Sequence, residues 1–187
     1  MLPRDCRPMQ GRLPLASKNF LTDLEQHMSH PPSLPRLGQG FYWQDLHVGQ
    51  RFETFRRTVT ETDNVLFTTM TMNVQPLHLD AEFASKTEFG KPLVNSIFTL
   101  GLIIGISVND TTLGTTVGNL GFGETRFPKP VFAGDTLRAK TKIVAMRESK
   151  SRPDVGIVEF EHTCQNQRGE LVEICRRQAM MRKKPKA

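Results

Sequence analysis

Residues 95–110 read NSIFTLGLIIGISVND, and this apolar run decides the fold of the chain. Large apolar residues recur at helical spacing from Ile97 to Val108. The run is too short to span a bilayer, and glycine and small polar residues interrupt it. We therefore expect a buried helix that begins at Asn95 or Ser96.

The sequence on either side of this run predicts what covers the helix. A helix that is apolar nearly all round must be wrapped, and a curved antiparallel sheet is the simplest wrapper. The predicted fold class is α+β, a single domain with a curved antiparallel sheet around a long central helix. The expected strands are Arg51–Val59, Thr116–Phe127, Thr136–Arg147, Gly156–Gln165 and Leu171–Met181, with one helix after Thr60 and a short one from Asp80 through Phe89.

Smaller signals refine this outline. Thr60, followed three residues later by Asp63, reads as a shortened capping box for the first helix. Gly101 and Gly105 lie one turn apart on the central helix, which predicts that a strand or helix approaches it closely there. Alternation in the Thr136–Arg147 strand places its apolar residues, up to Ala145, on one face.

Length and composition indicate one folded domain. The chain has 187 residues, 37% of them apolar, which is enough for one real core and short for two. We expect a flexible N-terminal arm or leader at 1–38, the folded domain at 39–182 and a basic tail at 183–187. Within the arm, only Phe20–Gln26 could form a helical turn, and Met28 is an alternative start.

Charge and cysteine content narrow the class of protein. Net charge is +6, concentrated at the C-terminus. A solvated tail is the simplest explanation and a patch for a phosphate-bearing ligand is the second. Nucleic-acid binding is disfavoured because no recognised nucleic-acid motif accompanies the charge. The three cysteines lack metal-ligand spacing, and their odd number without a secretory signal suggests reduced thiols in a cytoplasmic protein that no membrane segment anchors.

The stretch from Thr71 to Ala84 carries the chemistry. Asn73 and His78 stand five residues apart across Pro76, just before a predicted helix. The proline fixes its own φ, so the loop can aim two side chains at one point. Histidine is the side chain best suited to proton transfer near neutral pH. The stretch therefore favours an enzyme.

Two separated motifs resemble those of one family. Met72–His78, with alanines soon after, resembles the hydratase signature of the MaoC-like dehydratases, the R-specific enoyl-CoA hydratases, which adopt the hotdog fold. Arg126–Leu137 resembles the family's later block, in which a strand ends in a Pro-Val and Gly-Asp-Thr turn. The segment Arg147–Pro153 is similar to a sub-branch that handles mesaconyl- or methylmalyl-type thioesters. The resemblance covers about 41–181.

This resemblance implies a reaction and a set of catalytic residues. The reaction is reversible hydration of an enoyl-CoA to a 3-hydroxyacyl-CoA, with a branched dicarboxylic acyl group implied by the sub-branch. His78 would do the acid/base work, and the backbone N–H of Ser96 would stabilise the thioester oxygen. Asn73 stands where the family has aspartate. An amide can orient a water by hydrogen bonds, but it cannot take a proton from it.

The resemblance also implies how substrate is held and how chains assemble. Asn95 beside the helix start would contact the substrate, and cations would bind its CoA phosphates or a second carboxylate. The cations expected in this role are Arg126, Lys129 and Arg152. CoA enters as part of the substrate, and no other cofactor or metal is expected. A homodimer or higher homo-oligomer with the site between protomers is implied.

Structural alternatives stay open for several of these residues. Asn73 could only hold the turn, Asn95 and Ser96 could only cap the helix, and Asp80 could be an N-cap. Glu82 would then be a solvated helix residue and His162 a packing residue. Two other functions also remain: a thioesterase that uses Asp80 or Glu82, and an acyl-CoA-binding subunit without activity.

Overall fold

The computed structural model describes residues 38–185. The predicted arm at 1–38, with its helical turn at Phe20–Gln26 and the alternative start at Met28, lies outside the described residues except for Gly38. No helix within the described range is both long and apolar enough to cross a membrane.

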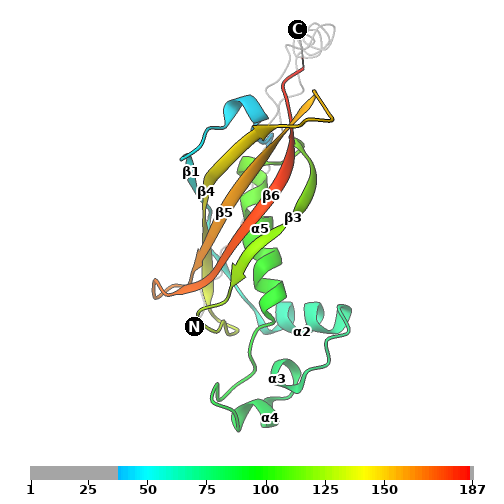
Figure 1. The fold of residues 1–187 in the computed structure, drawn as a ribbon. Coiled ribbons are helices and arrows are strands. Elements are labelled where there is room, and N and C mark those ends of the chain that lie inside the picture. The colour runs from blue at the N-terminus through cyan, green and yellow to red at the C-terminus, as the bar shows by residue number, and fades with distance from the viewer. Residues whose placement is uncertain (1–37, 186–187) are drawn as a thin grey trace, which may run out of the picture. The chain divides into compact units, whose positions relative to one another are not determined.

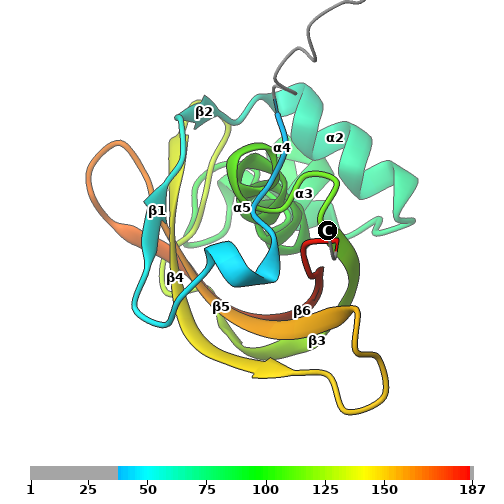
Figure 2. The same cartoon turned by 90° about the horizontal axis from the view of Figure 1, so that it is seen from above.

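The central element is α5 (Ser96–Thr111), which begins where the apolar run predicts. Asn95 is its N-cap, with the side-chain oxygen accepting from the Ile97 N–H at 3.0 Å. The face that includes Thr99, Ile103 and Ser107 is buried. The helix lies in the hollow of the sheet, which curves around it (Figure 2).

The sheet is antiparallel throughout, with the order β1-β4-β5-β6-β3 and β2 paired to β4 beside β1. Its long strands follow α5 in the chain, and they agree with the predicted ones to within one residue at each end. They are β3 (Thr116–Arg126), β4 (Thr136–Glu148), β5 (Val155–Gln165) and β6 (Leu171–Arg182).

The single strand predicted at Arg51–Val59 is wrong. The structure has two short strands, β1 (Arg51–Glu53) and β2 (Arg57–Thr58), which both pair with β4. Thr54 breaks the run because its hydroxyl, in place of a strand carbonyl, accepts the Ala139 N–H at 3.0 Å. A side-chain oxygen in the ladder turns the backbone away from strand geometry.

Short helices gather at the N-terminal end of α5 (Figure 1). They are α2 (Glu61–Met70), α3 (Pro76–Leu79) and α4 (Ala81–Ser85), while a 3-10 turn at Trp43–Asp45 precedes β1. The predicted capping box is confirmed, since the Thr60 hydroxyl accepts from the Asp63 N–H. The helix predicted from Asp80 through Phe89 ends instead at Ser85. Just beyond this end, the Thr87 hydroxyl donates to the Ala84 carbonyl at 2.7 Å.

Two apolar clusters form the core. One surrounds Ile103 and Leu137 and lies between α5 and the sheet. The other surrounds Ile143 and Phe160, and the 3-10 turn and β1 pack against it. Ala145 was predicted to share the buried face, but it is exposed. The register shifts between Ile143 and Ala145, and this bulge turns Ala145 to the outer face.

Helix α5 is less completely buried than its apolar composition predicts. Ile97 is 55% exposed, and Gly101 and Gly105 are exposed as well. A methyl group added at either glycine would meet nothing within 4 Å in the part of the chain that the structure describes. The prediction of a close approach at these glycines is therefore wrong within this chain.

Two glycines lie where an added Cβ would collide. At Gly156 it would lie 2.3 Å from the Trp43 side chain, and at Gly40 it would lie 2.5 Å from the Leu113 backbone nitrogen, just after the C-terminal end of α5. Gly40→Ala should lower the free energy of unfolding by about 1–3 kcal/mol, because backbone rather than a flexible side chain must move. Gly101→Ala is the matched control and should raise it by about 0.5–1 kcal/mol through helix propensity. Urea unfolding measures both, and equal effects would contradict this account.

Candidate active site

His78 lies where α3 meets the segment that leads into α5. Pro76 starts α3, and His78 is half-buried on its single turn. The His78 Nδ1 atom is 2.8 Å from the carbonyl oxygen of Leu93. Since a carbonyl can only accept, Nδ1 carries the proton and Nε2 is the free acceptor of the neutral ring. The Nε2 atom is therefore ready to take a proton.

Asn64 of α2 ties this region together. Its side-chain nitrogen donates to the carbonyls of His78 and Leu93, at 3.0 and 3.3 Å. Its side-chain oxygen accepts the backbone N–H of Asn95 at 2.9 Å. The residue is only 4% exposed. One amide thus joins α2, the histidine turn and the start of α5, a role that the sequence analysis missed.

Ser96 opens α5 beside a cavity of about 360 Å³. The cavity is also walled by Leu93, Thr99, the Phe127–Val131 loop and Val172. As the first helical residue, Ser96 has no intrahelical partner for its N–H, and no other partner appears within 38–185. Asn95 uses its own side-chain oxygen for the cap. A free N–H at a helix N-terminus favours a negatively charged oxygen.

Asn73 makes local contacts. Its side-chain oxygen accepts the Gln75 N–H at 3.2 Å, and its own N–H donates to the Thr68 carbonyl at 3.0 Å. Met72 beside it has a φ of 56°, in the left-handed region. In this conformation Asn73 holds the turn that precedes His78. Its role in orienting a water stays a prediction.

The two nearby carboxylates have structural roles. Asp80 is the N-cap of α4, accepting the Phe83 N–H at 2.9 Å, as the alternative interpretation predicted. Glu82 is exposed and lies 2.9 Å from Lys86 in an ion pair one turn away. A thioesterase that used either group would first have to release it from these contacts.

The predicted substrate-binding cations are spread over the domain. Lys129 is exposed and lines the cavity beside Ser96. Arg126 is two residues before the proline turn, exposed and 3.1 Å from Glu124. Arg152 lies in the β4–β5 turn, 2.8 Å from Asp154. That turn is at the end of the sheet where α5 ends (Figure 1). The structure brings Lys129 and Ser96 together and leaves Arg152 at the other end; binding by any of the cations stays a prediction.

Several other titratable groups are buried in the sheet, among them Arg177, His162 and Glu173. His162 is fully buried, with Nδ1 2.8 Å from the Thr141 hydroxyl, and burial lowers its pKa to about 3. It is a neutral packing residue, as predicted. Glu173 is also fully buried, and neither of its carboxyl oxygens has a hydrogen-bond partner among the described residues. Burial raises the pKa of Glu173 to about 8.

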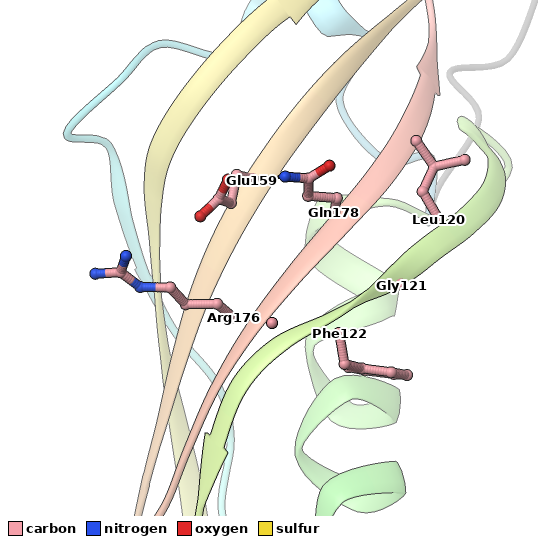
Figure 3. Close-up of a pocket in the computed structure, with 7 residues that line it drawn as sticks. Leu120, Gly121, Phe122, Glu159, Arg176 and Gln178 are labelled. Carbon is pink, nitrogen blue, oxygen red and sulfur yellow. Dashed lines mark hydrogen bonds between the residues drawn. The ribbon is translucent and has the colours of Figure 1, made fainter.

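Other hollows lie on the outer face of the sheet. One of about 310 Å³ is bordered by Leu120 and Phe122 of β3, and by Glu159 and Gln178 (Figure 3). Gln178 donates to Glu159 at 3.0 Å, so these polar groups are already paired. Within 38–185 no cluster of three or more His, Cys, Asp or Glu side chains could hold a metal ion. The cavity beside Ser96 is therefore the better candidate site.

The sequence is similar to those of several known proteins. Residues 45–166 match the family described as MaoC like domain. The chain is 31% identical over 149 residues to mesaconyl-CoA hydratase from Cereibacter sphaeroides, across 79% of this chain and 43% of that protein. It is 32% identical over 111 residues to an (R)-specific enoyl-CoA hydratase from Aeromonas caviae, across 57% of this chain and 78% of the relative.

A solved structure shares the fold. A conserved hypothetical protein from Mycobacterium tuberculosis, described as having a double hotdog fold, superposes with a TM-score of 0.73. The identity is 25%, and the match covers 82% of this chain and 47% of that chain. The predicted hotdog architecture and the predicted family resemblance are both confirmed. The chain spans less than half the length of the mesaconyl-CoA hydratase.

Asn64→Asp tests the amide that joins the site. Aspartate keeps the size of the side chain and the oxygen that accepts the Asn95 N–H. Its second carboxylate oxygen, however, faces the carbonyls of His78 and Leu93, which need a donor. We expect a loss of about 1–3 kcal/mol in the free energy of unfolding, from the unpaired buried groups. Urea unfolding measures the loss, with the exposed Asn119→Asp as matched control. Equal stability of the two variants would contradict the role given to Asn64.

Glu173 makes a pH-dependent contribution to stability. Its pKa is raised from 4.5 to about 8, so between these values the folded chain keeps a proton that the unfolded chain releases. Stability should therefore fall as pH rises through this range, by up to about 1.4 kcal/mol per pH unit from this group. Glu173→Gln removes the titration, so urea unfolding at several pH values should show a flatter profile. Parallel profiles for the two proteins would refute a protonated Glu173.

Proposed function

This chain belongs to the MaoC-like dehydratase family, and from that premise we propose that it catalyses the reversible hydration of an enoyl-CoA to a 3-hydroxyacyl-CoA. The observation that carries the proposal is the free N–H of Ser96 at the wall of the cavity. Leu93 connects this point to His78. It lines the same cavity, and its carbonyl oxygen accepts the hydrogen bond that His78 Nδ1–H donates. An oxyanion donor and a proton carrier are thus held by one short segment.

The first part of the proposed reaction concerns the thioester oxygen. This oxygen gains negative charge when water adds to C3 and the C2–C3 double-bond electrons move toward the carbonyl. The Ser96 N–H donates to it, and the positive end of the 16-residue helix α5 adds to the stabilisation. One such donor contributes about 3 kcal/mol to a transition state of this kind.

The second part concerns the proton. The free Nε2 of His78 takes a proton from water as the water oxygen bonds to C3. The resulting imidazolium then delivers a proton to C2, which completes the 3-hydroxyacyl product and restores the neutral ring. The Leu93 carbonyl holds Nδ1–H throughout, which stabilises the imidazolium and keeps the ring in place. Asn73 orients the water without taking its proton.

We also propose how the CoA group of the substrate is bound and in which cell compartment the protein acts. The CoA phosphates bind cations at the mouth of the cavity, where Lys129 is the best placed, with Arg126 close in sequence. No cofactor beyond the CoA of the substrate takes part. The protein acts in the cytoplasm, since Cys164 and Cys175 are both free thiols.

The proposed assembly is a homodimer. Strand β3 forms an edge of the sheet that no strand within 38–185 covers, and its Leu120 and Phe122 are each 48% exposed (Figure 3). The turn before α3 exposes Met72 and Val74, and α2 exposes Met70. Apolar side chains this exposed favour burial against a second copy, which would also close the site.

His78→Ala tests the reaction. With crotonyl-CoA or mesaconyl-CoA, the native protein should remove the enoyl absorbance, and the variant should be slower by about 10²–10⁴-fold through loss of the proton carrier. The exposed His47→Ala is the matched control and should keep native activity. Release of free CoA, followed with a thiol reagent, would indicate a thioesterase instead. No turnover across a broad acyl-CoA panel would overturn the hydratase proposal.

A further inference from the structure

A buried carboxylate lies just beyond one wall of the cavity beside Ser96. Asp135 is 4% exposed, and its side chain is not part of the cavity wall. It comes four residues after the end of the Phe127–Val131 loop, which does form a wall of the cavity. The proposed hydration gives Asp135 no part, although a carboxylate this buried must be held by specific contacts.

The two oxygens of Asp135 connect two separate parts of the chain. One oxygen accepts the backbone N–H of Phe132, the residue after the Phe127–Val131 loop, at 3.0 Å. The other accepts from the Gln167 side chain at 2.9 Å and from the Arg168 guanidinium at 3.0 Å, both in the β5–β6 turn. Burial alone would raise the pKa of Asp135, but these hydrogen bonds outweigh burial and lower it, so the carboxylate is ionised at neutral pH. Hydrogen bonds to an ionised group are stronger than those between neutral groups.

Both of the parts that Asp135 connects lead to the cavity. The β5–β6 turn ends where β6 begins at Leu171, and the next residue, Val172, lines the cavity. Val131, the last residue of the loop, is 5% exposed and lines it as well. One carboxylate therefore fixes two walls of the cavity relative to each other.

The loop is in turn bonded to the segment that starts α5. The Val131 carbonyl accepts the Val94 N–H at 2.9 Å, and Val94 lies two residues before Ser96. The next N–H along the chain, that of Asn95, donates to the side chain of Asn64 in α2. The start of α5 is thus held at two consecutive N–H groups, one bonded to α2 and the other to the cavity wall.

We propose that Asp135 is a positioning residue for the hydration reaction: it holds the Phe127–Val131 loop, and through this loop it sets the position of the Ser96 N–H. The inference rests on the proposed hydratase function and adds a residue to it. An oxyanion donor works only within a narrow range of positions, and a misplacement of about 1 Å can cost about 10²-fold in rate. Asp135 thereby affects the transition state from outside the cavity.

Asp135→Asn tests the inference. An amide has one accepting oxygen, so it cannot serve both the Phe132 N–H and the two donors of the β5–β6 turn. The substrate is whichever of crotonyl-CoA and mesaconyl-CoA the native protein hydrates faster. We expect kcat to fall by about 10–100-fold while KM stays within about twofold, because an interaction made only in the transition state is weakened. Arg168→Met removes one donor at a half-exposed position and should give a smaller loss of kcat.

Asp45→Asn is the matched control. Asp45 makes the same kind of contact, since it accepts the N–H of Tyr42, three residues earlier, at 3.1 Å and also pairs with Lys184. It belongs to the 3-10 turn, which packs against the second apolar cluster, and none of the residues of this turn lines the cavity. Urea unfolding should show that both aspartate variants are less stable than the native protein, but only Asp135→Asn should lower kcat.

Ser96→Pro shows whether Asp135 acts through the Ser96 N–H. Proline removes this N–H and is favoured at the first position of a helix. The ψ of 122° at Asn95 is outside the α region that proline disfavours in the residue before it. Ser96→Pro alone should lower kcat by about 10²–10³-fold. In that background Asp135→Asn should cause little further loss, because the donor that it positions is already gone.

The outcomes separate this inference from the proposed function. Native kcat in both Asp135→Asn and Arg168→Met, or an equal loss in Asp45→Asn, would overturn the inference and leave the hydratase function standing. A full additional loss from Asp135→Asn in the Ser96→Pro background would also overturn it, because Asp135 would then act by another route. No turnover by the native protein across a broad acyl-CoA panel would overturn the hydratase function and this inference with it.

Discussion

The side-chain amide of Asn64 is the interaction on which the site depends. It bonds to backbone groups of three residues that lie 14, 29 and 31 positions away in the chain. A buried amide that is fully used in this way fixes position better than apolar contacts, because hydrogen bonds have direction. The histidine turn and the helix start keep their spacing through this one side chain.

The fold could be predicted because its signals are local. The alternation of Leu171–Met181 and the apolar periodicity of Ile97–Val108 each lie within one element, and the structure has those elements to within a residue. Thr54 and the bulge after Ile143 could not be predicted, since both arise from pairing with a distant strand. A side-chain oxygen that enters a ladder leaves no mark on the local pattern.

The site was predictable in part for the same reason. Motif spacing pointed to His78 and Ser96. The structure connects them through Leu93, whose carbonyl bonds to the His78 ring and which lines the cavity together with Ser96. Asn64 could not be found this way, because its role exists only once α2 lies against the start of α5. The signal available in the sequence was an asparagine inside a helix. Only its burial, which the structure gives, distinguishes it from an asparagine on the surface.

The bond from His78 Nδ1 to the Leu93 carbonyl also bears on stereochemistry. It leaves the ring a single nitrogen with which to exchange protons. In the proposed hydration this one nitrogen would handle both protons, so hydroxyl and hydrogen would be added to the same face of the double bond. A syn addition is thus the stereochemistry that the proposal implies, and it would follow from a tautomer that a backbone carbonyl selects.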